Sequence, residues 1–354
     1  MTSLDDPELL ALDREGMLSH ISSLGHELWT AWQQSEDLVA PVGEEAVTAV
    51  VLAGMGGSAT AGDYVAALAA ASSEIPISVC RGYSLPNYVS DRTLVIVSSY
   101  SGNTDEALSL YDDAWKRGAP LLCITAGGRL AARAGADAVP VYRIAYRSAP
   151  RAAMAHGLAP LLRIGSRLEW FSLGDDDVLN AGRAHSRLSS MGLAPSSALE
   201  SNGAKQAAVL LRGRVPFVFA SDHLAPVAAR FRNQLAENGK ALGSAEEVPE
   251  AVHNLVVGLS TASAVRDSVA AVAIESRGTC DLRSVRQMDG LVEQFEEAGI
   301  PVWRIDVGSG PLLEQLLLGT AWGDYTSYYL ALLNGVDPTP IPQIDRLKAP
   351  PVSL

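Results

Sequence analysis

The chain has 354 residues, of which 48% are hydrophobic, and its formal net charge at pH 7 is −13. This length favours two domains, and the acidic balance excludes nucleic acid and an anionic membrane surface as expected partners. The three cysteines show no metal-ligand spacing, and no signal peptide or membrane-spanning run is visible, which predicts a cytoplasmic protein with free thiols.

Hydrophobic residues near helical spacing predict one or two helices over residues 7–35. Strands and helices then alternate, which indicates a doubly wound α/β domain with a parallel sheet. The expected strands are 47–53, 76–80, 93–99, 120–125 and 139–144, and the expected helices are 58–71 and 104–117. The centre of the third strand is apolar throughout, as is typical of a parallel strand covered on both faces.

A helical segment over 151–171 is predicted to lead into a second α/β unit, and an acidic, loop-like stretch covers 172–177. The strands expected next are 215–220, 269–274 and 301–306, and the helices are 202–211, 225–238, 285–298 and 310–333. The proline-rich residues 338–351 are predicted to form an ordered arm on the surface, because proline cannot continue a helix. The predicted divisions are a helical segment (1–40), a first domain (41–170), a second domain (171–335) and a C-terminal arm (336–354).

Two turns rich in glycine and hydroxyl groups follow strands of the first domain. Residues 54–58 read Gly-Met-Gly-Gly-Ser, and residues 99–104 read Ser-Tyr-Ser-Gly-Asn-Thr. Each turn opens a helix whose free N–H groups attract an anion, at the strand ends where open α/β sheets bind ligands. Helix capping explains either turn alone, but both turns in one domain favour a cradle for one phosphate.

The first turn also fits a loose dinucleotide-binding pattern, with Gly54, Gly56 and Ala59 at the glycine positions. Such a site requires an acidic residue after the second strand to bind a ribose. Arg81 and Gly82 stand there instead, and no lysine follows the glycines as a P-loop requires. We therefore favour a monophosphate over a nicotinamide cofactor.

The ordered set of motifs resembles the bifunctional phosphoglucose/phosphomannose isomerases, a family with two sugar isomerase (SIS) domains. Besides the two turns, the matching residues are Pro150-Arg151, Gln-Leu-Ala-Glu-Asn at 234–238, and His253-Asn254. The ending matches as well, with Gly-Val-Asp-Pro at 335–338 and Ile-Asp-Arg-Leu-Lys at 344–348. The resemblance covers nearly the whole chain and implies two tandem SIS-type doubly wound domains.

The resemblance implies an enzyme that interconverts glucose 6-phosphate and fructose 6-phosphate, with mannose 6-phosphate left open as a further substrate. The residues that it implies for the phosphate are Gly57, Ser58, Ser99, Ser101 and Thr104. The residues that it implies for catalysis are Glu237, His253, Lys348 and Arg151. No metal and no cofactor are implied. Because the family's site lies between two subunits, with the histidine supplied by the partner, a homodimer is implied too.

Isomerisation through an enediol needs a base, a group that opens the sugar ring, and a cation for the enediolate. By resemblance, Glu237 is the base and Arg151 the cation, while His253 and Lys348 open the ring. Each has an ordinary alternative without the resemblance. Glu237 and Arg151 are then charges at helix ends, His253 is a packed or surface histidine, and Lys348 is a surface lysine.

Two positions depart from the family pattern. Leu255 replaces a glutamate that usually follows the His-Asn pair, which removes an acidic neighbour of His253. Ile341 stands where the family has a threonine associated with the mannose epimer, although Thr339 is two residues away. Ile341 favours glucose 6-phosphate over mannose 6-phosphate as the substrate. Both departures leave a second hypothesis open, a sensor that binds a sugar phosphate without turnover.

Overall fold

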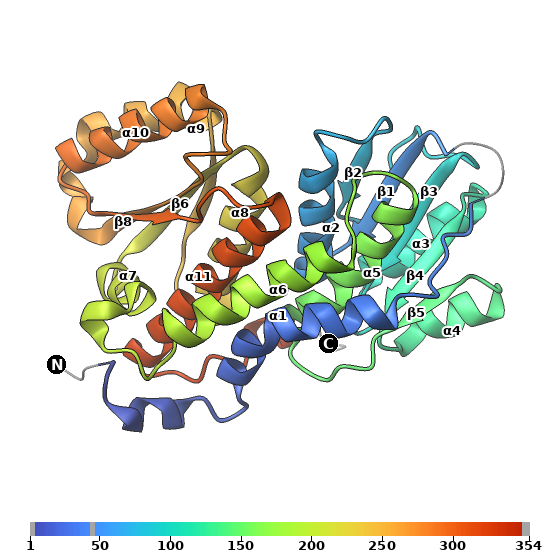
Figure 1. The fold of residues 1–354 in the computed structure, drawn as a ribbon, viewed down its shortest axis with the longest axis horizontal. Helices are drawn as coiled ribbons and strands as arrows, with labels where there is room; N and C mark the ends of the chain where they lie inside the picture. Colours follow the sequence, from blue (N-terminus) through green and yellow to red (C-terminus); the bar gives the residue numbers. More distant parts are fainter. Residues whose placement is uncertain (1–3, 43–46, 349–354) are drawn as a thin grey trace, which may run out of the picture.

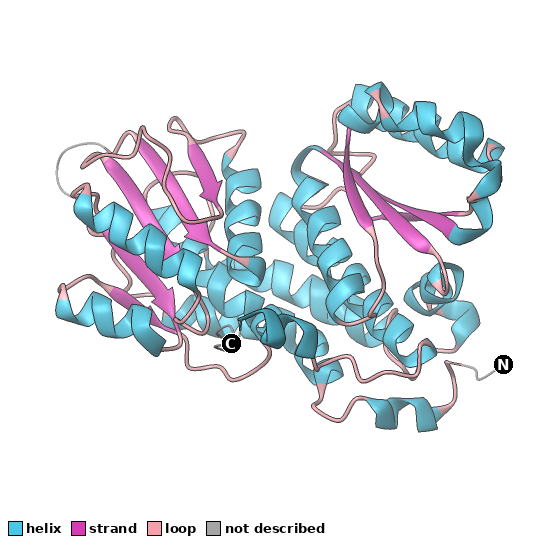
Figure 2. Ribbon diagram, turned by 180° about the vertical axis from the view of Figure 1, so that it is seen from behind, coloured by secondary structure: helices cyan, strands magenta, loops and turns pink. Residues whose placement is uncertain are grey.

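The computed structural model describes residues 4–42 and 47–348. Two parallel β-sheets lie side by side, with helices packed around and between them (Figures 1 and 2). Among the described residues, one sheet has five strands in the order β2-β1-β3-β4-β5, and the other has four in the order β7-β6-β8-β9. The predicted α/β class, with parallel sheets flanked by helices, is confirmed.

The first sheet carries the two glycine turns. Its strands are β1 (Ala49–Gly54), β2 (Ile77–Cys80), β3 (Thr93–Ser98), β4 (Leu121–Thr125) and β5 (Val141–Arg143). Its helices are α2 (Gly56–Ala69), α3 (Asp105–Lys116) and α4 (Gly128–Ala136). Every residue of β1, β3 and β4 is buried, as their apolar sequences predict. The strand order reverses between β1 and β3, where ligands of such sheets bind.

The second sheet repeats this arrangement with one strand fewer. Its strands are β6 (Val215–Ser221), β7 (Ser244–Val248), β8 (Val269–Glu275) and β9 (Val302–Asp306). The helices around it are α7 (Gly203–Leu211), α8 (Ala225–Glu237), α9 (Glu250–His253) and α10 (Leu282–Glu297). Short 3₁₀ segments are η3 (Leu199–Ser201), η4 (Asp222–Leu224), η5 (Leu255–Ala264) and η6 (Arg266–Ser268).

Long helices join the two halves. They are α1 (Met17–Gln34), α5 (Met154–Arg167), α6 (Asp175–Met191) and α11 (Leu312–Leu333), with the shorter η1 (Pro7–Leu12), η2 (Pro150–Ala153) and α12 (Pro342–Lys348). α1 packs on α5 and α6, while α11 packs on α6, α7 and α8 (Figure 1). Nearly all of α11 is buried, which matches its apolar sequence. No helix within 4–42 and 47–348 combines the length and apolar character needed to span a bilayer.

Two close contacts fix the helices that join the halves. α1 crosses α6 at a pair of glycines, where a Cβ on Gly25 would lie 2.2 Å from the carbonyl oxygen of Gly182. Near the N-terminus, Asp5 accepts a hydrogen bond of 2.7 Å from Nζ of Lys205, whose side chain is fully buried in α7. Residues 5–34 therefore connect the half that contains the second sheet to helices of the half that contains the first sheet.

One prediction about an irregular segment is wrong. The acidic stretch 172–177 is not all loop, because α6 begins at Asp175. Three successive aspartates there favour a helix N-terminus, and the Asp177 carboxylate accepts a 2.8 Å hydrogen bond from the Gly174 N–H. The arm contains a short helix, α12, which starts at Pro342, a position that proline tolerates. Residues 349–354 of the arm lie outside the described residues.

Candidate active site

The candidate phosphate cradle lies where β1 and β3 end beside each other. The sheet register pairs Gly54 with Ser98, so the turns after the two strands leave the same edge of the sheet. α2 begins at Gly56, within the first turn, and α3 begins at Asp105, directly after the second. The first N–H groups of a helix have no partner inside it. Two helix N-termini at one edge therefore favour an anion there.

The hydroxyl groups of the second turn are held in place by one another and by the backbone. Oγ of Ser99, which is buried, donates to Oγ1 of Thr104 at 3.1 Å and accepts from the Gly102 N–H at 3.2 Å. Oγ of Ser101 accepts from the Asn103 N–H at 3.2 Å. Gly102 has a φ of +65°, and a Cβ there would lie 1.9 Å from the carbonyl oxygen of Gly127. This turn consequently requires glycine.

The first turn brings the cradle against Arg151. Gly57 lies in the first turn of α2, and a Cβ on it would come within 3.3 Å of the carbonyl oxygen of Pro150 and 3.4 Å of Cα of Arg151. The structure thus groups the predicted phosphate residues on two adjacent turns, with Ser58 partly exposed beside Gly57. Their role in phosphate binding stays a prediction.

Arg151 lies in η2 and joins three separated segments. Its side chain is only 3% exposed, and its Nη1 lies 3.6 Å from Oε2 of Glu237 at the end of α8. Nε donates to Oδ1 of Asn238 at 2.7 Å. Nη2 donates to the carbonyl oxygens of Pro338 at 2.8 Å and Thr339 at 2.9 Å. Nη1 is buried with no hydrogen-bond partner among the described residues, so it remains able to donate.

The charges at this point suit a reaction that develops negative charge. Burial lowers the pKa of Arg151, and the Glu237 carboxylate opposes that shift, while an arginine keeps its charge in proteins. The Glu237 side chain is 26% exposed, so it remains accessible from outside. An accessible carboxylate beside a fixed, buried cation can remove a proton and stabilise the oxyanion that forms.

A buried polar network holds the α8 helix in position. Arg230 donates to the Asp324 carboxylate at 2.8 Å, and the amide of Gln234 donates to the same carboxylate at 2.8 Å. One turn further along α8, the amide of Asn238 donates to Oγ of Ser327 at 3.1 Å. These contacts fasten the last two turns of α8 to α11, so the backbone that carries Glu237 is fixed.

The structure separates His253 from Glu237. α8 ends at Glu237 before β7 begins, whereas α9, with His253, follows the end of β7. The two residues therefore lie toward opposite ends of β7, a strand that spans about 16 Å at roughly 3.3 Å a residue. His253 is exposed, and no described contact joins it to Glu237 or Arg151.

The C-terminal arm is only partly brought to the site. Thr339 lies against Arg151 through its carbonyl, and its own Oγ1 is buried without a partner in the described part of the chain. Ile341 is partly buried, and Lys348 is exposed at the end of α12 with no described contact to Glu237. Leu255, the other departure from the family pattern, packs against the apolar cluster beneath α10.

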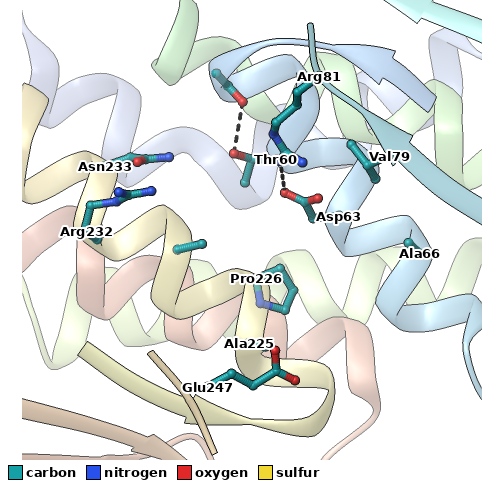
Figure 3. A pocket seen from close by; sticks show the side chains of 12 residues that line it. Thr60, Asp63, Ala66, Val79, Arg81, Ala225, Pro226, Arg232, Asn233 and Glu247 are labelled. Carbon is teal, nitrogen blue, oxygen red and sulfur yellow. Dashed lines mark hydrogen bonds and ion pairs between the residues drawn. The ribbon is translucent and has the colours of Figure 1, made fainter. Parts of the chain in front are cut away.

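A groove of about 780 Å³ lies between α2 and α8 (Figure 3). Gly56, at the start of α2, is part of its lining, and polar side chains from both helices line it, among them Thr60, Asp63 and Asn233. Arg81, which argued against a ribose site, is paired with Asp63 here. The volume is typical of a small-molecule site.

Sequence reasoning missed two residues of this region, Asn238 as a partner of Arg151 and Lys240. The Nζ of Lys240 donates to the carbonyl oxygens of Glu237 and, at 3.0 Å, Pro338. One signal was available, because Asn-Gly after Glu237 marks a helix end, where a lysine often bonds the last carbonyls. Across residues 4–42 and 47–348, no three His, Cys, Asp or Glu side chains are placed to hold a metal ion.

Comparisons with known proteins support the predicted fold and family. Residues 200–350 match the model of the bacterial phospho-glucose isomerase C-terminal SIS domain. A bifunctional phosphoglucose/phosphomannose isomerase of Caldicellulosiruptor bescii is 32% identical over 334 residues, covering 94% of this chain and 98% of that protein. One from Aquifex aeolicus is 30% identical, covering 84% and 89%. The structure of a glucose-6-phosphate isomerase like protein from Thermus thermophilus is similar in fold, with a TM-score of 0.62, 19% identity, and 96% and 99% coverage.

Proposed function

Because the chain belongs to the bifunctional phosphoglucose/phosphomannose isomerase family, we propose that it interconverts glucose 6-phosphate and fructose 6-phosphate. It is an intramolecular oxidoreductase, an aldose–ketose isomerase that acts on sugar monophosphates. Mannose 6-phosphate is a second proposed substrate, in keeping with the names of the relatives. The sensor hypothesis is not favoured, because Glu237 and Arg151 are both present and lie together.

The observation that carries this proposal is the pair of Arg151 and Glu237 beside the phosphate cradle. With the substrate phosphate at Gly57, Ser58, Ser99, Ser101 and Thr104, the carbons to be isomerised extend toward that pair. In the glucose-to-fructose direction, the Glu237 carboxylate takes a proton from C2 and returns it to C1, while the hydroxyl proton moves from O2 to O1. The Arg151 guanidinium stabilises the enediolate oxygen between these steps.

Ring opening is assigned to His253 and Lys348. Within a single subunit, both residues lie away from Glu237. The separation of His253 and Glu237 by the length of β7 supports a site shared in a homodimer, where His253 of the partner subunit completes it. We also propose a cytoplasmic location. The proposed division of the chain is a phosphate-binding domain (41–170), a catalytic domain (171–335) and an arm (336–354) with Lys348.

The arm bears on the choice between the two aldoses. Ile341 offers no hydrogen-bonding group where the family has threonine, but Thr339 brings an unpartnered buried hydroxyl close to Arg151. We therefore propose turnover of mannose 6-phosphate at a lower rate than glucose 6-phosphate. Equal rates on the two sugars in one assay would show that Ile341 does not limit the enzyme.

Replacing Glu237 tests the proposed base. Glu237→Gln keeps the size of the side chain but removes its basicity, so kcat for glucose 6-phosphate should fall by roughly 10²–10⁴-fold. KM should change little, because the cradle is intact. The measurement is conversion of glucose 6-phosphate to fructose 6-phosphate by the purified protein.

Glu296→Gln is the matched control, since Glu296 is an exposed glutamate near the end of α10. It should leave kcat unchanged. Turnover that survives in Glu237→Gln would remove Glu237 from the mechanism. Binding of glucose 6-phosphate by the unaltered protein without any turnover would instead support the sensor hypothesis.

A further inference from the structure

Lys240 lies just beyond the end of α8, and its side chain turns back toward the candidate site. Its Nζ donates to the carbonyl oxygen of Glu237 and, at 3.0 Å, to that of Pro338. Nη2 of Arg151 donates to the same Pro338 carbonyl at 2.8 Å. Two basic side chains from distant parts of the chain thus share one acceptor where the C-terminal arm begins.

The backbone around Lys240 is fixed in an uncommon conformation. Lys240 has a φ of +53°, in the left-handed region that residues other than glycine seldom adopt. The carbonyl oxygen of the preceding Gly239 accepts a 2.9 Å hydrogen bond from the Asn334 amide, just after α11. This backbone aims the lysine back along its own helix, where a basic group bonds the last carbonyls.

We propose that Lys240 is a positioning residue of the isomerase, which ties the end of α8 to the start of the arm so that Glu237 and the arm keep one arrangement. The inference rests on the proposed function and extends it to a residue that the family resemblance did not assign. Within the described part of the chain Lys240 bonds only backbone carbonyls, so it acts through Glu237 and Pro338.

The tie depends on the N–H donors of Lys240 more than on its charge. The groups that face it are Arg151 from η2, Glu237 from α8 and Asp337 from the segment after α11. Burial and repulsion by Arg151 lower the pKa of Lys240 to about 8, against the attraction of the two carboxylates. Because the pKa of Lys240 in this position lies below that of a free lysine, loss of the proton favours the side chain bonded to the two carbonyls over a side chain that extends into solvent. A neutral amine still donates to both carbonyls, so the tie persists above pH 8.

Two substitutions separate this role from general loss of structure. Lys240→Met has similar length and no donor, whereas Lys240→Arg keeps donors. We expect Lys240→Met to lower kcat for glucose 6-phosphate by roughly tenfold or more, with KM and inhibition by inorganic phosphate within about twofold. Lys240→Arg should recover most of kcat. Lys116→Met, at an exposed lysine in the last turn of α3, is the matched control.

Hydrogen exchange of peptides from the arm provides a readout that does not need turnover. Peptides covering 336–347 should exchange faster in Lys240→Met than in the unaltered protein, while peptides from the first sheet stay unchanged. Unchanged kcat, or a lost kcat with unchanged exchange of the arm, would overturn the positioning role. If the unaltered protein shows no turnover, the proposed function fails, and the exchange experiment still decides whether Lys240 ties the arm.

Discussion

Arg151 is placed by contacts that no short sequence motif contains. Its guanidinium donates hydrogen bonds to Asn238, just after α8, and to Thr339, in the segment after α11. These two partners lie 87 and 188 residues away in the chain. A lysine has no planar fork of five donors and cannot meet Asn238, Pro338 and Glu237 together. The requirement for arginine at this point therefore comes from tertiary structure as much as from its proposed contact with an enediolate.

His185 provides a prediction about acid stability. It is fully buried in α6, and burial together with repulsion by Arg230 lowers its pKa to about 4. Between pH 6.5 and about 4 the unfolded chain binds a proton at this residue and the folded chain does not. Folding stability should therefore fall as the pH falls through this window, by up to about 1.4 kcal/mol per pH unit from this group.

The check is the free energy of unfolding in urea at pH 7 and pH 5 for the protein and for His185→Gln. The variant should lose less stability between the two pH values, whatever its stability at pH 7. His26→Gln, at an exposed histidine of α1, should leave the pH dependence unchanged. An equal loss in the protein and in His185→Gln would contradict the assignment.

At the residue scale, sequence motifs predicted the side chains of the site better than their partners. Arg151 and Glu237 were selected by motif, and the structure brings them within 3.6 Å. The carbonyl oxygens of Pro338 and Thr339 could not be predicted, because every residue has a carbonyl and only the fold selects which one faces a cation. The separation of His253 from Glu237 also required the strand order, which motif spacing does not contain.

At the scale of elements, the sequence predicted the buried strands and the long helices α1, α5 and α11, whose patterns are strong. It missed β7, an edge strand whose sequence Ser-Ala-Glu-Glu-Val is too polar to resemble a covered strand. It also missed α4, which is short and starts at a glycine, and the long helix α6, where serines and one glycine weaken the helical pattern. These elements form because neighbouring elements cover their apolar sides.

The crossing of α1 and α6 gives a prediction for Gly25→Ala. The added methyl would lie 2.2 Å from a backbone oxygen of α6, so the two helices must separate. We expect a loss of about 1–3 kcal/mol or more in the free energy of unfolding. The measurement is the midpoint of urea unfolding.

Gly290→Ala in α10 is the matched control, because a Cβ there meets nothing within 4 Å. Helix propensity alone should then stabilise the protein by up to about 1 kcal/mol. If both alanine variants gained stability, the α1–α6 contact would not be as close in solution as the structure has it.

At the scale of the whole molecule, the two sheets are similar in topology but differ in what their edges present. The edge of β1 and β3 offers hydroxyl groups and free helix ends. At the corresponding edge of β6 and β8, the Asp222 carboxylate accepts hydrogen bonds from the Asp281 N–H at 3.0 Å and from Oγ of Ser284 at 3.2 Å. A side-chain anion thus occupies the start of α10, which explains why phosphate binding is proposed for one sheet.

The proposed sharing of the site between subunits predicts complementation. Glu237→Gln and His253→Gln should each be nearly inactive alone. A mixed dimer keeps one site with both residues intact, and half the dimers formed at random are mixed. Co-expression should therefore restore about a quarter of the unaltered activity.

Two differently tagged copies of Glu237→Gln, co-expressed in the same way, are the control and should show no recovery. Activity that stays absent in the mixed Glu237→Gln and His253→Gln dimers would mean that His253 serves the site of its own chain. That outcome would leave the Glu237 assignment intact, because the single variants test it separately.

The bond between Asp5 and Lys205 has a consequence for synthesis on the ribosome. The two residues are 200 positions apart, so at typical translation rates Asp5 emerges roughly 10–40 s before its partner exists. During that interval the first sheet can form, since all its strands precede residue 150. The N-terminal segment that carries Asp5, however, has no Lys205 to bind. The order of synthesis therefore makes this segment one of the last to reach its native position, although it is the first to be made.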